Sequence, residues 1–339
     1  MGIFRSFSHS VKGAGHNKSG LPCQDFSLDN DKDKDRKAFI AIVADGHGSS
    51  QYFRSDIGSK IVAEVALNGI EEFIVQSKSL HGTFLKGEGK KALNQLARYI
   101  ISEWYSRVSD DELSSPLNND ERMNTVDDKY KNKYLNDPDR QYFCHAYGTT
   151  LIAVAVSLNY WFGFQIGDGK CVALYEDGTW EQPIPWDDKC FLNSTTSICD
   201  DDSVGEFRYW FGYRQNDGAF KEYRYGVDGQ NHDEEKTLTS KPIAVFVNSD
   251  GVDDTYPVHE NEKHLKYLYR SIVLSFAAEG FENTKEQILE LAKKLAEQGS
   301  QDDVSIAGVI GDLGAKCSLI DELTLQAEAD KLKKNRNIS

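Results

Sequence analysis

Runs of apolar residues that meet an acid at one end recur along this chain. Six consecutive apolar residues at 39–44 predict a buried strand. That strand leads directly into Asp45-Gly46-His47-Gly48, a polar turn with two glycines. Comparable junctions, given as strand and acid, are 160–166 with Asp168, 243–248 with Asp250, and 304–310 with Asp302 and Asp303.

Apolar residues at helical spacing predict four amphipathic helices. Across 55–76 they recur every three or four positions and leave one polar face. The other helices are expected at about 89–108, 262–279 and 284–298. Further strands are expected at 150–157 and 170–175, with 157–159 short enough for a hairpin connection.

The order of these elements is strand, helix pair, strands, strand, helix pair, strand. It does not alternate as a doubly wound parallel sheet would, and it favours an α+β fold with helices packed outside antiparallel sheets. One large domain is expected over 1–313, followed by a short helix and tail at 314–339. Within the domain we expect a polar insertion at about 109–140 and an irregular, flap-like region at about 177–240.

Acids at several strand ends suit divalent cations. Hard cations prefer oxygen ligands, and carboxylates from different strands could converge on one pair of ions. Asp25, near the start of the chain, is a further candidate. The simpler alternative is that each acid only caps its own turn.

The charge balance argues against several classes of partner. Lys and Arg number 39 against 54 acids, which gives a net charge of −15. Such a field repels nucleic acids and anionic membranes. No apolar run reaches the roughly 18 residues of a membrane span, and no signal-peptide pattern opens the chain. The six cysteines form no CxxC pair, so we expect reduced thiols in a cytoplasmic protein.

Taken together, the motifs resemble those of the metal-dependent type 2C (PPM) serine/threonine protein phosphatases, bacterial branch. The resemblance runs over residues 16–310 and rests on motifs that occur in the family's order, which are Asp25, 45–48, 148–150, 167–169, 249–251 and 302–305. It implies a four-layer α-β-β-α sandwich of two antiparallel sheets flanked by helix pairs, with a metal cleft at one end.

The resemblance also implies a role for each acid. Asp45 would bridge two Mn²⁺ or Mg²⁺ ions, and a water between them would attack phosphorus. The other expected metal-site residues are Asp25, the carbonyl of Gly46, Asp250 and Asp302. Asp168 would hold a third, weaker ion, brace metal-bound water, or serve only as a hairpin acid.

Two neighbouring acids compete for one of these roles. Successive strand residues point to opposite faces, so only one of Asp302 and Asp303 should reach the metal. The resemblance favours Asp302. The alternative is that both acids only end a helix-to-strand turn. Residues 148–150 are expected to be structural, as small residues beneath the site.

His47 is the candidate general acid. An imidazole has a pKa near neutrality and can protonate a departing serine or threonine alkoxide. The alternative is a histidine that only hydrogen-bonds the loop beside the metals.

The chain departs from the family pattern in two places. Gln24 stands where many members have a Glu that contributes to the second ion. The phosphate-binding Arg is also missing, since no Arg occurs between Arg5 and Asp25. His16 and Lys18 are the nearest cations, and Lys18 is the candidate substrate-binding residue, although it could equally be an ordinary solvated residue.

The resemblance implies hydrolysis of phosphoserine and phosphothreonine in proteins. The expected partners are a phosphorylated protein substrate and a cognate Ser/Thr kinase or its targets. One alternative is a catalytically weak or inactive pseudophosphatase that binds phosphoproteins or a kinase, and another is a phosphatase for a small metabolite. The aromatic segment 207–214 is either a recognition flap or a strand packed on the core.

Overall fold

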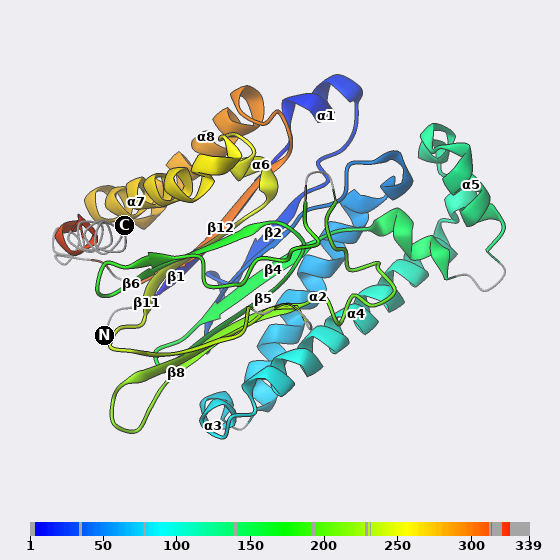
Figure 1. Ribbon diagram of the computed structural model, residues 1–339. Coiled ribbons are helices and arrows are strands. Elements are labelled where there is room, and N and C mark those ends of the chain that lie inside the picture. The colour runs from blue at the N-terminus through cyan, green and yellow to red at the C-terminus, as the bar shows by residue number, and fades with distance from the viewer. Residues whose placement is uncertain are drawn as a thin grey trace, which may run out of the picture.

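Two antiparallel sheets lie face to face between two layers of helices (Figure 1). The computed structural model describes residues 4–33, 36–77, 79–137, 141–191, 194–227, 230, 232–311, 313 and 321–325. The fold is therefore α+β, as the order of elements predicts, and it has the four layers that the family resemblance implies.

Each sheet combines strands from distant parts of the chain. The five-stranded sheet has the order β1 (Arg5–Val11), β12 (Val304–Ile310), β11 (Pro242–Asn248), β6 (Lys170–Tyr175), β7 (Trp180–Glu181). The seven-stranded sheet has the order β10 (Glu234–Leu238), β9 (Phe220–Tyr225), β8 (Arg208–Arg214), β5 (Tyr160–Ile166), β4 (Leu151–Val156), β3 (Phe39–Ala44), β2 (Phe26–Asp29). The hairpin between β4 and β5 is closed by the backbone N–H of Ser157, which donates to the Tyr160 carbonyl at 2.9 Å.

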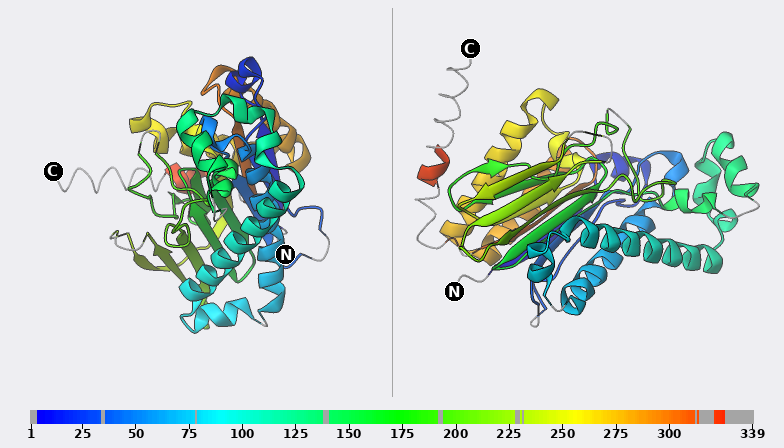
Figure 2. Two further views of the ribbon diagram at one scale, coloured as in Figure 1. Left: turned by 90° about the vertical axis from the view of Figure 1, so that its right-hand side faces the viewer. Right: turned by 60° about the horizontal axis from the view of Figure 1, so that its bottom comes forward.

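Helices cover the outer face of each sheet (Figures 1 and 2). The seven-stranded sheet carries α2 (Ser55–Gln76), α3 (Leu80–Leu85) and α4 (Gly89–Ser114). The five-stranded sheet carries α6 (Asp250–Asp253), α7 (Asn261–Glu279) and α8 (Phe281–Gln298). The remaining helices are α1 (Ala14–Ser19), α5 (Asp128–Leu135) and the 3₁₀ helices η1 (Ser50–Tyr52), η2 (Leu117–Asn119), η3 (Glu121–Thr125), η4 (Tyr142–Tyr147) and η5 (Val258–Glu260).

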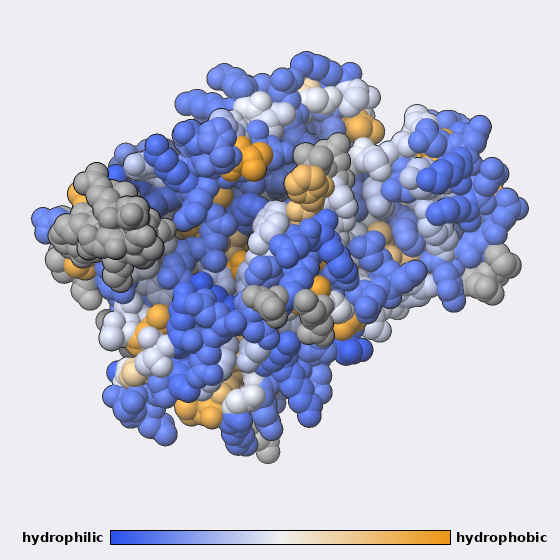
Figure 3. Space-filling view, in the orientation of Figure 1, coloured by the Kyte–Doolittle hydropathy of each residue, from blue (hydrophilic) through white to orange (hydrophobic). Residues whose placement is uncertain are grey.

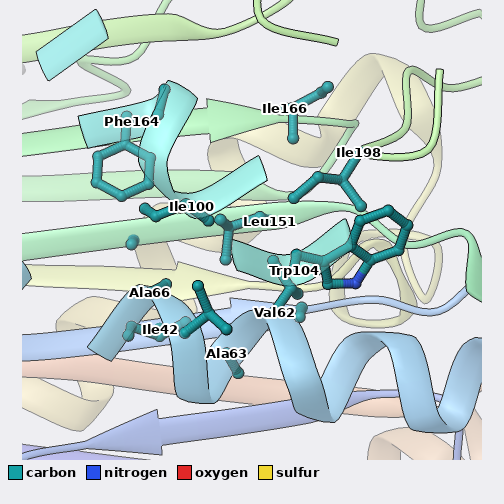
Figure 4. Close-up of a cluster of buried hydrophobic side chains, with 14 of the residues drawn as sticks. Ile42, Val62, Ala63, Ala66, Ile100, Trp104, Leu151, Phe164, Ile166 and Ile198 are labelled. Carbon is teal, nitrogen blue, oxygen red and sulfur yellow. The ribbon is translucent and has the colours of Figure 1, made fainter. Parts of the chain in front are cut away.

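Strand β3 shows why the central strands are apolar throughout. Ile40 and Ile42 face α2 and α4 in the helix-facing core (Figure 4), whereas Ala41 and Val43 lie in the layer between the two sheets. Because side chains alternate along a strand, a strand buried on both faces needs apolar residues at every position.

The polar insertion at 109–140 is more helical than expected. Helix α4 continues to Ser114, and η2, η3 and α5 follow, although 138–140 lie outside the described residues. Arg54 anchors this segment: it is 2% exposed and donates to Asp120 at 2.8 Å, Asp111 at 3.2 Å and the Ser115 carbonyl at 2.7 Å. The insertion is therefore tied to the start of α2, and α5 projects from the body of the fold (Figure 1).

The described residues of the region expected to be irregular, 177–240, contain the short strand β7 and the longer strands β8, β9 and β10. Strand β8 pairs with β5 and β9, and most of its side chains are buried, so 208–214 form a core strand and no flap. The tail at 314–339 lies outside the described residues except for 321–325, which are helical. Across the described ranges, each helix is too short or too polar to cross a bilayer.

Candidate metal centre

Strand pairing brings the acids to one end of the sandwich. Phe26 of β2 pairs with Ala44 of β3, so Asp25 and Asp45 occupy adjacent positions just beyond the paired segment. Asn248, at the end of β11, pairs with Lys170 at the start of β6. Within each pair, the strand pairing therefore brings the chain that leaves one strand next to the chain that enters the other.

The remaining acids enter from the other sheet and from a crossing between sheets. Asp250 follows β11, and Asp302 precedes β12, both in the five-stranded sheet. Asp168 lies where the chain leaves β5 in one sheet and enters β6 in the other. Gln165 donates to the carbonyls of Gly167 and Gly169, and this side chain holds the crossing in shape.

A cavity of about 510 Å³ lies where these segments meet. The expected site residues that line it are Asp25, Asp45, Gly46, His47, Asp168, Asp250 and Asp302. Asp254 and Tyr52 line it as well. None of the described lining residues is a lysine or an arginine. The structure thus brings together every expected site residue except Lys18.

The backbone of Asp45 is held from two sides. Its carbonyl accepts hydrogen bonds from the Thr149 hydroxyl and the Thr150 N–H, each at 2.8 Å, and its N–H donates to the Thr150 hydroxyl at 3.1 Å. A Cβ on Gly46 would lie 2.6 Å from the carbonyl oxygen of Gln24, so this turn requires glycine. These contacts fit a structural role for 148–150 and leave the Asp45 carboxylate to the cavity.

Burial of several carboxylates close together disfavours their charged forms. Burial, followed by repulsion from neighbouring acids, raises the pKa of Asp45 and of Asp250 well above the ordinary value. Burial and Asp303 raise the pKa of Asp25 to about 7, and burial also raises the pKa of Asp168. A cation among these oxygens would remove the repulsion.

Two buried oxygens at this cavity also lack hydrogen-bond partners among the described residues. They are Oδ2 of Asp25 and Oε1 of Gln24, both from residues that line the cavity. Oxygen atoms of this kind are the ligands that Mg²⁺ and Mn²⁺ prefer. The donor set therefore fits divalent ions.

Asp302 and Asp303 have different surroundings. Asp303 is 3% exposed and accepts from the N–H groups of Gly13 at 2.7 Å and Gln24 at 2.5 Å, while Nδ1 of His16 lies 3.0 Å away. The side chain of Asp302 is 57% exposed. The Asp303 carboxylate thus connects the backbone at Gly13 and Gln24, whereas the Asp302 carboxylate is largely exposed to solvent.

Gln24 has a bracing role that the sequence did not reveal. Its Nε2 donates to the Ser55 hydroxyl at 2.6 Å and to the His47 carbonyl at 3.2 Å, and its own carbonyl accepts from the Ser59 hydroxyl at 2.5 Å. The side chain therefore connects the Asp25 loop to the turn that carries His47.

His47 packs against an aromatic ring beside the acids. The centres of the His47 and Tyr52 rings are 4.6 Å apart, and the His47 N–H donates to the Gly148 carbonyl at 3.2 Å. Burial lowers the pKa of His47 to about 4, so the ring is neutral at neutral pH. To act as a general acid, it must gain a proton when an anionic substrate binds.

Lys18 does not reach the cavity. It is exposed on α1, and its Nζ donates to Oε1 of Gln301 at 3.0 Å. Its substrate-binding role stays a prediction. The sequence reading missed Asp253 and Asp254, although they follow Asp250 at one-turn spacing; burial raises the pKa of Asp253 to about 7.

Comparison with known proteins identifies a family that matches most of the chain. The family model described as Protein phosphatase 2C matches residues 12–298. No curated protein matches.

Solved structures with low sequence identity also match. The serine/threonine phosphatase of S. agalactiae is 16% identical, with 91% of this chain and 99% of that chain covered and a TM-score of 0.49. The catalytic domain of the serine/threonine protein phosphatase PstP, in complex with two manganese ions, is 13% identical (92% and 99% covered, TM-score 0.47). PppA, a key regulatory component of T6SS in Pseudomonas aeruginosa, is 17% identical (91% and 98% covered, TM-score 0.45).

Proposed function

The chain belongs to the protein phosphatase 2C family, and from this premise we propose that it hydrolyses phosphoserine and phosphothreonine in proteins with the help of divalent cations. The observation that carries the proposal is the convergence of Asp25, Asp45, Asp168, Asp250 and Asp302, from both sheets, on one cavity. The expected partners, a phosphorylated protein and a cognate kinase or its targets, follow from this activity.

We expect two Mn²⁺ or Mg²⁺ ions at these acids, held by Asp45, the Gly46 carbonyl, Asp250 and Asp302. Asp25 would act through water, and Asp168 would hold a third, weaker ion. When bound, the ions would activate water for attack on phosphorus and neutralise phosphoryl oxygens.

The chain's own residues would complete the site. His47 is placed beside Asp45 and would donate a proton to the departing alkoxide. Gln24 and the threonines at 149 and 150 would keep the Asp45–His47 turn in position. Because no lysine or arginine is found among the described lining residues, the ions would provide most of the positive charge that binds phosphate.

The test is hydrolysis of a phosphothreonine peptide with Mn²⁺ and with EDTA. We expect Asp45→Asn and Asp250→Asn to lose at least about 100-fold in kcat/KM. Asp128→Asn is the matched control, because this side chain is 97% exposed on α5. Metal binding measured by calorimetry should weaken in the first two variants and stay the same in the control.

The alternative is a pseudophosphatase. Two observations favour it: Gln24 has an amide in place of a carboxylate, and His47 is the only basic residue among the described residues that line the cavity. A folded wild-type protein that binds Mn²⁺ and the phosphopeptide without turnover would support this alternative. Faster hydrolysis of sugar or nucleotide phosphates than of any phosphopeptide would instead indicate a metabolite phosphatase.

A further inference from the structure

A second cavity, of about 930 Å³, adjoins the metal centre. The two share Asp168, Asp250 and Asp254 as lining residues. A molecule held by its phosphate among the acids therefore has a continuous path into the second cavity. We call the second cavity the docking groove and define it by Lys170, Trp180, Trp186, Phe191, Val258 and Asn261.

The docking groove exposes large apolar side chains. Trp186 is 41% exposed, Phe191 72% and Val258 85%. Trp186 and Phe191 come from the segment after β7, and Val258 comes from η5, so distant parts of the chain contribute. On the face shown in Figure 3, apolar side chains form small separate areas in a mainly hydrophilic surface. Unlike scattered exposed residues, these three side chains line one cavity, which fits an interaction site.

Lys170 fixes the position of Trp186 next to the metal centre. Its Nζ lies 3.5 Å from the centre of the Trp186 ring, in cation–π contact, and donates to the Asp168 carbonyl at 3.1 Å. Lys170 therefore links the indole of Trp186 to the backbone of Asp168, an acid of the cavity. An apolar group that flanks a bound phosphate would lie within the cavity that this ring lines.

The sheet edge at the docking groove suits an extended chain. Strand β7 is the outermost strand of the five-stranded sheet, and its Trp180 and Glu181 line the docking groove. A polypeptide beside an edge strand can add hydrogen bonds of its own, which a small phosphate ester cannot.

We propose that the docking groove binds the polypeptide next to the phosphorylated residue of the substrate, with an apolar side chain of that polypeptide packed between Trp186 and Val258. The inference rests on the proposed function, since it takes the acid-lined cavity as the phosphate site. It predicts a preference for phosphorylated residues flanked by apolar side chains.

Two phosphothreonine peptides test the proposal. They are identical, except that one carries Leu and Val near the phosphothreonine and the other carries Ser at those positions. The wild-type protein should prefer the apolar peptide by about tenfold in kcat/KM. Val258→Ser and Trp186→Ala should reduce this ratio to about twofold or less, and Trp186→Phe should retain most of it. A ratio between two peptides cancels any change in the chemical step itself.

The control is Val75→Ser, at a side chain that is 60% exposed on α2; it should keep the wild-type ratio. Equal rates for both peptides with the wild type, or a full ratio in Val258→Ser and Trp186→Ala, would overturn the docking proposal. If the wild type hydrolyses neither peptide, the proposed function fails, and fluorescence anisotropy then decides the docking proposal separately. In that case, the ratio of the two dissociation constants should show the same preference and the same loss in Val258→Ser.

Discussion

The carboxylate of Asp303 accepts a hydrogen bond from the backbone N–H of Gln24 at 2.5 Å, and this contact joins the start of β12 to the loop that carries Asp25. The same carboxylate accepts from Gly13 at 2.7 Å. One buried side chain thus sets the position of two loops beside the acid-lined cavity, while the neighbouring Asp302 side chain is largely exposed.

We expect Asp303→Ala and Asp302→Ala to separate stability from metal binding. Asp303→Ala leaves buried N–H groups unpaired and should lower the free energy of unfolding by about 3 kcal/mol. Asp302→Ala should cost less than about 1 kcal/mol, because its side chain is 57% exposed, but should weaken Mn²⁺ binding. Urea unfolding in EDTA and calorimetry with Mn²⁺ measure the two effects. Equal stability losses in both variants would contradict the assignment.

Without metal, the fold should lose stability as pH rises, so stabilisation of the fold by bound Mn²⁺ should increase with pH. The pKa of Asp25 and of Asp253 is about 7 in the folded chain, against an ordinary 3.8, so between these values the folded state binds more protons than the unfolded state. Stability in EDTA should therefore fall as pH rises through this window and stay lower above it. His47, with its pKa lowered to about 4, acts in the opposite direction only below about 6.5, so the effect is clearest from 6.5 upward.

Because metal ligands must be deprotonated, Mn²⁺ should raise the melting temperature more at pH 8 than at pH 6. At free Mn²⁺ 100-fold above Kd, the gain is about 2.7 kcal/mol. Thermal scans with Mn²⁺ and with EDTA at both pH values give the comparison. An equal shift at the two pH values would show that Mn²⁺ binding does not displace protons from the acids of the cavity.

His47→Ala should affect substrates according to their leaving groups. A threonine alkoxide needs a proton as it departs, whereas an aryl phosphate releases a stable phenolate. We expect about a 100-fold loss of kcat for a phosphothreonine peptide and less than about fivefold for p-nitrophenyl phosphate. His81→Ala, on α3, is the control and should match the wild type. A similar loss on both substrates would assign His47 a positioning role only.

Gln24→Glu should make the fold less stable and its Mn²⁺ binding tighter. A carboxylate cannot donate to the His47 carbonyl or the Ser55 hydroxyl, so the free energy of unfolding in EDTA should fall by about 1–3 kcal/mol. The added negative charge in the cavity should tighten Mn²⁺ binding by about tenfold. Gln298→Glu, exposed at the end of α8, makes the same change in net charge and should do neither.

Hydrophobic periodicity predicted most of the core elements well. The bounds expected for α2, β3, β5, β6 and β12 agree with the structure. Strands β1 and β2 were missed, because their residues are half polar and face a partly solvated surface. Strand β8 was hard to distinguish from a flap, since its aromatic run shows no alternation until the packing on both faces is known.

Most acids of the candidate site were visible in the sequence because they stand at the ends of apolar strands, and Asp45, Asp168 and Asp250 are each followed by glycine. The residues that hold them were not. Arg54 has the sequence context of a surface residue before a helix, and its burial depends on Asp111 and Asp120, more than 50 positions away. Likewise, the contact between Lys170 and Trp186 forms because the segment after β7 folds back to the start of β6. Such partners are set by tertiary structure, which a local pattern does not encode.

The two sheets each contribute acids to the same cavity, Asp45 from one and Asp250 from the other. The distance between these carboxylates is therefore set by the thickness of the side-chain layer between the sheets, in which Trp161 and Trp210 are almost fully buried. A smaller residue in that layer would bring the sheets closer or leave them less firmly spaced. If these acids bind ions as proposed, ion affinity would respond to packing between the sheets, and core residues that never touch an ion would still affect it.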